Sequence, residues 1–277
     1  MTVDVSTRDV RGRVLAVTLS IIAAAAFAWP FVAEMSGLPT AIVSIVAVGI
    51  APVVLVGILI SAETTLREPR VLALVGVLAA LAAAARLLSA GVAGIEFVFV
   101  VVILAGRILG ARLGFVVGAM AMAVSSMVWG GFGPWTAFQM MAVGWVGAGA
   151  GLLPLFRLKA GKPFLFNEIA LLMVYGAVAS YAFGLVMNLW FWPLALGSGT
   201  TLSLVQGAGL AENAASFLLY SLATSTLTWD TVRAITTVVT LAVIGGPAVK
   251  ALRRVYVRPV LDRKVFSLRV MKDKSVS

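Results

Sequence analysis

The chain has 277 residues, of which 61% are hydrophobic and only 12% are charged, against about 25% charged residues in soluble domains. This composition excludes a soluble globular domain and predicts an all-α membrane helix bundle, whose outer surface must match lipid tails. The formal charge is +10, but aromatic residues are not interleaved with the basic ones, so we expect the lipid bilayer rather than nucleic acid to face these charges.

Eight apolar stretches follow one another along the chain, and most reach the length of about 20 residues that a membrane span needs. They cover residues 14–33, 40–61, 70–89, 95–109, 113–129, 136–156, 166–190 and 231–252. The fourth stretch is short for a full crossing, and we expect it either to be tilted or to meet its neighbour in a tight turn at Gly110. The sequence therefore predicts a polytopic protein with about eight transmembrane helices.

The distribution of Lys and Arg predicts how these spans are oriented. Of the 21 basic residues, all except Arg86 and Arg233 lie on one side of the alternating spans. That side holds Arg8, Arg11, Arg13, Arg67, Arg70, Arg107, Arg112, Arg157, Lys159, Lys162 and every basic residue from Lys250 onward. Because basic loops are retained in the cytoplasm, we expect a multi-pass protein of the cell membrane with both termini on the cytoplasmic side.

Arg86 and Arg233 lie near the outer ends of their spans, a few residues from the acids Glu96 and Asp230. An ionisable side chain at such a position is costly, and it is usually paired or functional. We therefore expect Arg86 to act with Glu96, and Asp230 to pair with Arg233 three residues later on the same helix. The alternative is that both arginines extend to the membrane interface.

Small residues recur along the third span at helical spacing. Gly76, Ala80 and Ala84 are four residues apart, and Ala79 and Ala83 lie beside them. This spacing puts them on one face, where another helix can approach closely. That face predicts close packing, either within the bundle or against a partner protein.

The outer loops gather tryptophans and polar side chains. The first contains the run Trp129-Gly130-Gly131-Phe132-Gly133-Pro134-Trp135-Thr136, whose glycines and proline predict a tight turn, and residues 191–229 form the second. Tryptophan at both membrane interfaces is typical of an aromatic belt, whereas a bias towards one face favours an outward-facing pocket. The tryptophans that map to this side are Trp29, Trp129, Trp135, Trp190, Trp192 and Trp229, whereas Trp145 falls inside a span.

Several enzyme classes are excluded by the absence of particular residues. Without Cys or His, the chain has no thiolate chemistry, no His-dependent hydrolase site and no His-based metal site. Gly161-Lys162 is followed by Pro163, so the sequence has no ATP-binding phosphate loop. We predict a protein that is not an enzyme and that holds no cofactor or metal of its own. A stand-alone secondary transporter of a small aromatic or apolar solute is the alternative, although the spans lack acids at their centres.

Two separated motifs resemble a known family. The runs Gly133–Met140 (GPWTAFQM) and Gly144–Pro154 (GWVGAGAGLLP) resemble the substrate-binding S component of energy-coupling-factor (ECF) vitamin transporters, with Ala137 where that family often has Pro. Thr224–Val249 is similar to the last helix of the same family. The resemblance covers about residues 70–256.

The resemblance implies a division of the chain into three parts. Residues 1–66 would form a cytoplasmic segment and an added two-helix hairpin, residues 67–256 a six-helix substrate-binding core, and residues 257–277 a basic cytoplasmic tail. An S component captures a vitamin from outside, while a transmembrane coupling subunit and two ATPase subunits supply the energy from ATP. The small-residue face would dock on the coupling subunit through Ala79 and Ala83 or through Ala80 and Ala84.

The expected ligand is a vitamin-like small molecule. The pattern looks most similar to the cobalamin-type branch, and riboflavin, thiamine or a cobalamin precursor would stack on the same aromatic surfaces. We expect ligand contacts from Trp129, Trp135, Thr136, Gln139, Met140, Asn188, Trp192 and Trp229. We expect Glu96 with Arg86, and Asp230 with Arg233, to brace the site.

Overall fold

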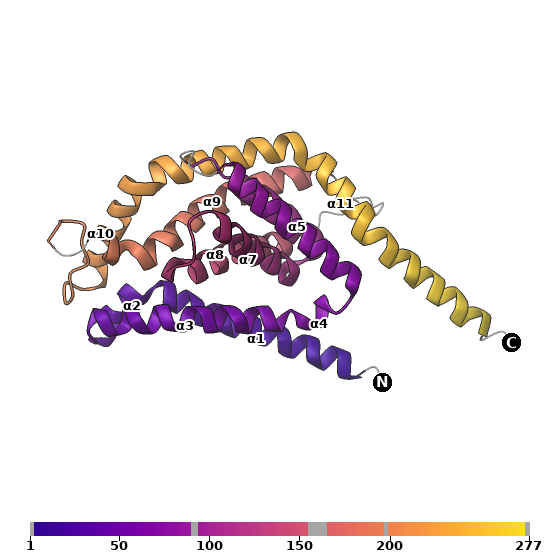
Figure 1. Ribbon diagram of the computed structural model, residues 1–277, viewed down its shortest axis with the longest axis horizontal. Helices are drawn as coiled ribbons and strands as arrows, with labels where there is room; N and C mark the ends of the chain where they lie inside the picture. The colour runs from indigo at the N-terminus through magenta and orange to yellow at the C-terminus, as the bar shows by residue number, and fades with distance from the viewer. Residues whose placement is uncertain (1–2, 90–93, 155–164, 197–198, 275–277) are drawn as a thin grey trace.

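The computed structural model describes the backbone of residues 3–89, 94–154, 165–196 and 199–274, and the side chains of the same ranges except residues 3–9, 64 and 257–274. Within these ranges every regular element is helical (Figure 1). The elements are α1 (Val3–Phe27), α2 (Trp29–Ser36), α3 (Thr40–Ser61), α4 (Glu63–Leu66), α5 (Pro69–Leu88), α6 (Val98–Leu109), α7 (Ala111–Val128), α8 (Pro134–Leu152), α9 (Leu165–Leu196), α10 (Leu210–Ser221), a π-helix η1 (Leu222–Asp230) and α11 (Thr231–Lys274).

The protein is an all-α, polytopic membrane helix bundle. Six of the described helical segments are long and apolar enough to cross a membrane: Val10–Phe27, Thr40–Ser61, Pro69–Leu88, Ala111–Val128, Leu165–Leu196 and Leu210–Tyr256. The fourth and sixth predicted spans correspond to α6 and α8, which do not reach that criterion. Almost all of α6 is buried, and α8 packs against both α6 and α7, so these two helices need not match lipid along their length.

Two predicted boundaries are wrong. The first predicted span is interrupted, because α1 ends at Phe27 and α2 begins at Trp29 with Pro30 in its first turn, where the missing N–H costs no hydrogen bond. The predicted outer loop 191–229 is largely helical, since α9 continues through Pro193 to Leu196 and α10 runs on through η1 into α11. Tertiary packing explains the longer α9, because Trp192 is fully buried against Phe31 and Phe217.

Glycines bring α6, α7 and α8 into close contact. A side-chain carbon added at Gly106 would collide with the backbone of Gly147, and one added at Gly114 would collide with the same carbonyl. One added at Gly118 would meet the backbone of Val143. Glycine is therefore required where these helices cross, and the glycines of the 144–154 motif serve helix packing.

The N-terminal helices share a hydrophobic core with the rest of the bundle. α1 and α3 lie side by side along one flank (Figure 1), and Phe27 contacts the Phe138 ring edge-on with centroids 4.8 Å apart. The Trp29 indole donates a hydrogen bond to the Trp190 carbonyl over 2.8 Å. α1 to α3 are thus fixed to α8 and α9, while the division of the chain at residue 66 stays a prediction.

The two ends of the bundle differ in charge. The start of α1 and the end of α11 lie on the same side of the bundle (Figure 1), as an even number of crossings requires. We call that end, which holds Arg67 and Arg107, the basic end, and the other, which holds the turn at 129–133, the outer end. The basic segment 157–162 lies outside the described residues. The backbone of the predicted tail is helical to Lys274.

Candidate functional site

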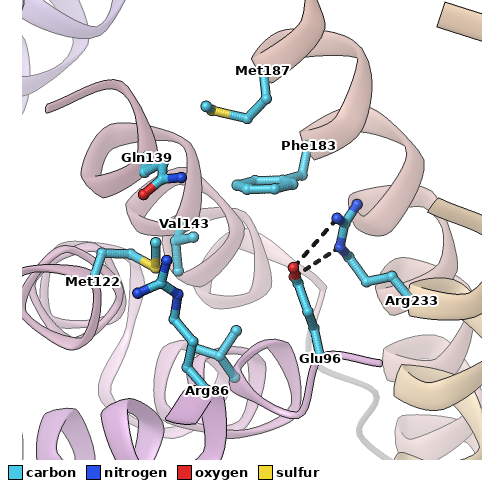
Figure 2. A pocket seen from close by; sticks show the side chains of 9 residues that line it. Arg86, Glu96, Met122, Gln139, Val143, Phe183, Met187 and Arg233 are labelled. Atoms are coloured by element: carbon cyan, nitrogen blue, oxygen red, sulfur yellow. Dashed lines mark hydrogen bonds and ion pairs between the residues drawn. The ribbon is translucent and has the colours of Figure 1, made fainter. Parts of the chain in front are cut away.

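A cavity of about 200 Å³ lies between helices at the outer end of the bundle. Side chains from α5, α7, α8, α9 and α11, and from the residues that begin α6, enclose it, and Figure 2 shows them facing a common space. The lining residues are Arg86, Glu96, Val98, Met122, Gln139, Val143, Phe183, Met187 and Arg233.

Arg233 holds one wall of the cavity together. Its Nε lies 2.8 Å from Glu96 Oε2 and its Nη1 lies 2.6 Å from Asp230 Oδ1 (the first pair is dashed in Figure 2). The Arg233 side chain is 7% exposed and that of Asp230 is 0% exposed, so Asp230 lies behind Arg233 while Glu96 faces the cavity. One arginine therefore contacts two carboxylates in a largely dry environment, where an unpaired charge would be costly. Arg86, the second arginine of the cavity, supplies the other positive charge and interacts electrostatically with Glu96.

Two glycines allow these charges to meet. Gly94 has a φ of +73°, and a side chain there would collide with Trp229 and Val232, so glycine lets the segment before α6 lie against the start of α11. This contact brings Glu96 to Arg233. A side chain at Gly184 on α9 would overlap the Asp230 carboxylate. The close approach of α9 to η1 therefore depends on glycine at that position.

Arg86 enters the cavity from a different side (Figure 2). Its Nη1 donates to Ser125 Oγ over 2.9 Å, and that hydroxyl in turn donates to the Ala121 carbonyl over 2.7 Å. Among the described residues, no carboxylate lies within 4.0 Å of the Arg86 guanidinium. Arg86 and Glu96 interact electrostatically, as predicted, but the hydrogen bonds of Glu96 go to Arg233.

The remaining wall is apolar and holds one amide. The Phe183 ring is fixed by edge-on contact with Phe99 at 5.2 Å and by the Arg233 guanidinium 4.9 Å from its centroid. Met187 lies one helical turn further along α9, and the Gln139 amide reaches the cavity from α8. The cavity thus offers a fixed aromatic ring beside hydrogen-bonding and charged groups, the mixture typical of small-molecule sites.

The structure brings together only part of the predicted contact set. Gln139 and Glu96 line the cavity, and Asp230 supports it through Arg233. Met140 is partly buried in the hydrophobic core. The Asn188 side chain does not line the cavity, and its Nδ2 is buried without a hydrogen-bond partner among the described residues.

Two other predicted contact residues have structural roles. Thr136 Oγ1 accepts a hydrogen bond from the Gly133 amide and caps the start of α8. Trp192 is 0% exposed and donates to the Leu202 carbonyl over 2.6 Å. Both residues hold the outer end in shape and lie outside the cavity lining.

The tryptophans of the outer end form two groups. Trp29 and Trp190 are buried, and Trp190 stacks on Phe138 with centroids 4.6 Å apart. The exposed group, which we call the tryptophan rim, consists of Trp129, Trp135 and Trp229 and is 40–54% exposed. None of the rim residues lines the cavity.

Sequence reasoning missed several lining residues. Arg86 and Arg233 were recognisable as the only basic residues away from the basic end, although we assigned them a bracing role. Met122, Val143 and Phe183 carry no sequence signal, because an apolar residue in a span looks the same whether it faces lipid, core or cavity.

A second buried ion cluster lies at the basic end. Glu168 Oε1 accepts from Arg107 Nε and from Arg253 Nη2, each at 2.7 Å, and Arg107 also donates to the Leu153 and Pro154 carbonyls. Glu168 is 1% exposed. This cluster joins α6, α9 and α11, and it closes the bundle at the end opposite the cavity.

The small-residue face of α5 divides into an inner and an outer row. Ala79 and Ala83 are buried inside the bundle, whereas Gly76, Ala80 and Ala84 are exposed. No atom lies within 4 Å of a side-chain carbon built at Gly76. Only the outer row is therefore open to another protein.

No family model matches the chain, and neither a curated protein nor a solved structure matches it. The fold and cavity alone define the class, which is an all-α, multi-pass membrane protein with a small, polar-lined cavity at one end of its bundle.

Proposed function

We propose that the chain is the membrane-embedded substrate-binding subunit of an ATP-driven, ECF-type micronutrient importer. The cavity at the outer end supports this proposal, because it combines a fixed aromatic ring, an amide and charged groups. The distribution of Lys and Arg predicts that this end faces outward, where an imported solute would arrive. In this proposal the chain binds its ligand and has no ATPase site of its own.

The size of the cavity favours a compact ligand. Its volume of about 200 Å³ is below the range of about 300–1,000 Å³ typical of sites for drug-sized molecules. A single-ring micronutrient or vitamin precursor suits this space better than an intact corrinoid such as cobalamin. A larger ligand would fit only if the helices that line the cavity moved apart.

The outer row of α5 is the proposed surface for the coupling subunit. Gly76, Ala80 and Ala84 are exposed at spacing of four, so a helix of a partner could approach the α5 backbone closely. The buried pair Ala79 and Ala83 packs within the bundle and is not part of this surface. Two ATPase subunits would act on the coupling subunit and not on this chain.

Ligand titration of the purified protein in detergent tests the binding role. Calorimetry measures the binding of each compound in a panel of vitamins and vitamin precursors, and we expect saturable binding of one of them. Gln139→Ala and Phe183→Ala should each weaken it by about tenfold or more, since each removes one wall of the cavity. Trp129→Ala, which changes an exposed rim residue, is the matched control and should bind as the wild type does.

Reconstitution separates this function from a secondary transporter. In vesicles that contain this chain alone, we expect no accumulation of the bound compound under a proton or sodium gradient. Uphill uptake by the chain alone would contradict the proposal and establish the secondary transporter instead.

A further inference from the structure

We propose that the ligand of the outer cavity carries a carboxylate and that the Arg86 guanidinium binds it. This inference rests on the proposed binding function, and it adds the chemical class of the ligand. It starts from a difference between the two arginines of the cavity.

Arg233 is already fully engaged by protein groups. Its Nε and Nη1 meet carboxylates at 2.8 and 2.6 Å, and its Nη1 also donates to the Ser180 carbonyl. Arg86 donates only to the neutral hydroxyl of Ser125, within the part of the chain that the structure describes. A guanidinium has five N–H donors, so most of the donors of Arg86 are left for the cavity.

Arg86 differs from the other charged groups of the cavity in its available hydrogen-bond donors, whereas the two arginines and the two acids Glu96 and Asp230 balance in net charge. Asp230 is shielded behind Arg233, so the lining itself presents the guanidinium groups of Arg86 and Arg233 and the single carboxylate of Glu96. Both Glu96 oxygens accept from Arg233, at 2.8 and 3.5 Å. Arg233 therefore takes up the hydrogen-bonding capacity of Glu96. Glu96 and Arg86 interact electrostatically, but among the described residues no carboxylate is hydrogen-bonded to Arg86.

A carboxylate suits Arg86 geometrically as well as electrostatically. Guanidinium and carboxylate groups form two parallel hydrogen bonds, and this pairing is strengthened where water is scarce. Phe183 is held in place by Phe99 and Arg233, so its ring offers a prepared surface for the apolar body of the ligand. The Gln139 amide can hydrogen-bond a ring heteroatom or a second polar group. The ligand class is a small, single-ring or similarly compact carboxylate.

Matched acids and amides test this inference on the purified full-length protein. Nicotinate and benzoate are compared by calorimetry with nicotinamide, benzamide and benzylamine, which have nearly the same shape but no negative charge. We expect at least one acid to bind about 30-fold or more tightly than its amide, because the amide cannot form two charged hydrogen bonds with the Arg86 guanidinium. Arg86→Gln should abolish this preference, and Arg86→Lys should retain part of it.

Arg67→Gln is the control, since it removes the same charge from an exposed site at the basic end and should leave the preference intact. Thermal unfolding of each variant checks that Arg86→Gln remains folded. Equal binding of acid and amide, tighter binding of benzylamine, or an acid preference that survives Arg86→Gln would overturn the inference. If an uncharged or cationic compound binds and Phe183→Ala abolishes its binding, the binding function stands and only the carboxylate assignment falls. If no compound of this set or of the vitamin panel binds, both fall.

Discussion

At the residue scale, Arg233 stabilises the outer end by forming ion pairs with two acids, Glu96 and Asp230. Arg233→Met would leave Asp230 buried and unpaired, and we expect it to lower the free energy of unfolding by about 3–5 kcal/mol. The measurement is thermal unfolding in detergent. The double variant Arg233→Met with Asp230→Asn should recover part of the loss, because the unpaired charge of Asp230 is gone.

The control is Arg67→Met, which breaks an exposed pair with Glu63 and should cost at most about 1 kcal/mol. An equal loss of stability in Arg233→Met and Arg67→Met would contradict this account.

Gly184 gives a separate prediction at the same scale. Because a side chain there would overlap the Asp230 carboxylate, Gly184→Ala must push α9 away from η1 or break the contact between Asp230 and Arg233. We expect a loss of about 1–3 kcal/mol in stability and weaker ligand binding, since the displaced Phe183 lies next to it in sequence. Calorimetric titration and thermal unfolding check the two effects. Wild-type stability with Gly184→Ala would show that the overlap relaxes without cost.

Residue chemistry predicted which charges matter and one of their two close pairs. Arg86, Glu96, Asp230 and Arg233 were identifiable because ionisable groups are rare in apolar spans. The pairing of Asp230 with Arg233 was predicted from their spacing of three residues and is confirmed. The pairing of Glu96 with Arg233 was not predictable, because Glu96 reaches Arg233 across 137 residues through a turn that depends on Gly94. Tryptophan was ambiguous for another reason: the same residue type fills the core at positions 190 and 192 and forms the exposed rim at 129, 135 and 229.

At the scale of the element, glycines set the spacing of α6, α7 and α8. Gly147→Leu would insert a side chain between these helices, and we expect a loss of at least about 1–3 kcal/mol in stability or failure to fold. Gly76→Leu is the matched control, because its side chain would point into open space on α5. It should unfold at the wild-type temperature. The proposed docking surface further predicts that Gly76→Leu weakens association with the coupling subunit, measured by co-purification.

The positions of the helices were predicted well from the apolar runs in the sequence, except near the outer end. The spans from 40–61 to 136–156 agree with α3 and α5 to α8 within a few residues, because long apolar runs bounded by Gly, Pro or Arg leave few alternatives. The prediction of a loop over residues 191–229 was wrong. Its Trp, Asn and Glu side chains are typical of a loop, but burial of Trp192, Asn213 and Phe217 makes much of the segment helical.

At the scale of the whole molecule, the orientation of the bundle is the prediction that decides where the cavity opens. The chain has no Cys, so single cysteines are clean reporters. We expect a membrane-impermeant maleimide to label Phe132→Cys in intact cells and to label Glu63→Cys only after lysis, since the two lie at opposite ends. The reverse pattern would invert the topology and place the cavity on the cytoplasmic side.

The most direct test of this account is whether the ligand occupies the cavity or the tryptophan rim. Met187→Cys places a thiol in the cavity and Trp135→Cys places one on the rim, and each is treated with a small methanethiosulfonate reagent with and without the tightest-binding compound of the panel. We predict that the compound protects the cysteine at position 187 and leaves the one at position 135 reactive. Protection at position 135 with free reaction at position 187 would place the ligand on the rim and contradict the cavity assignment.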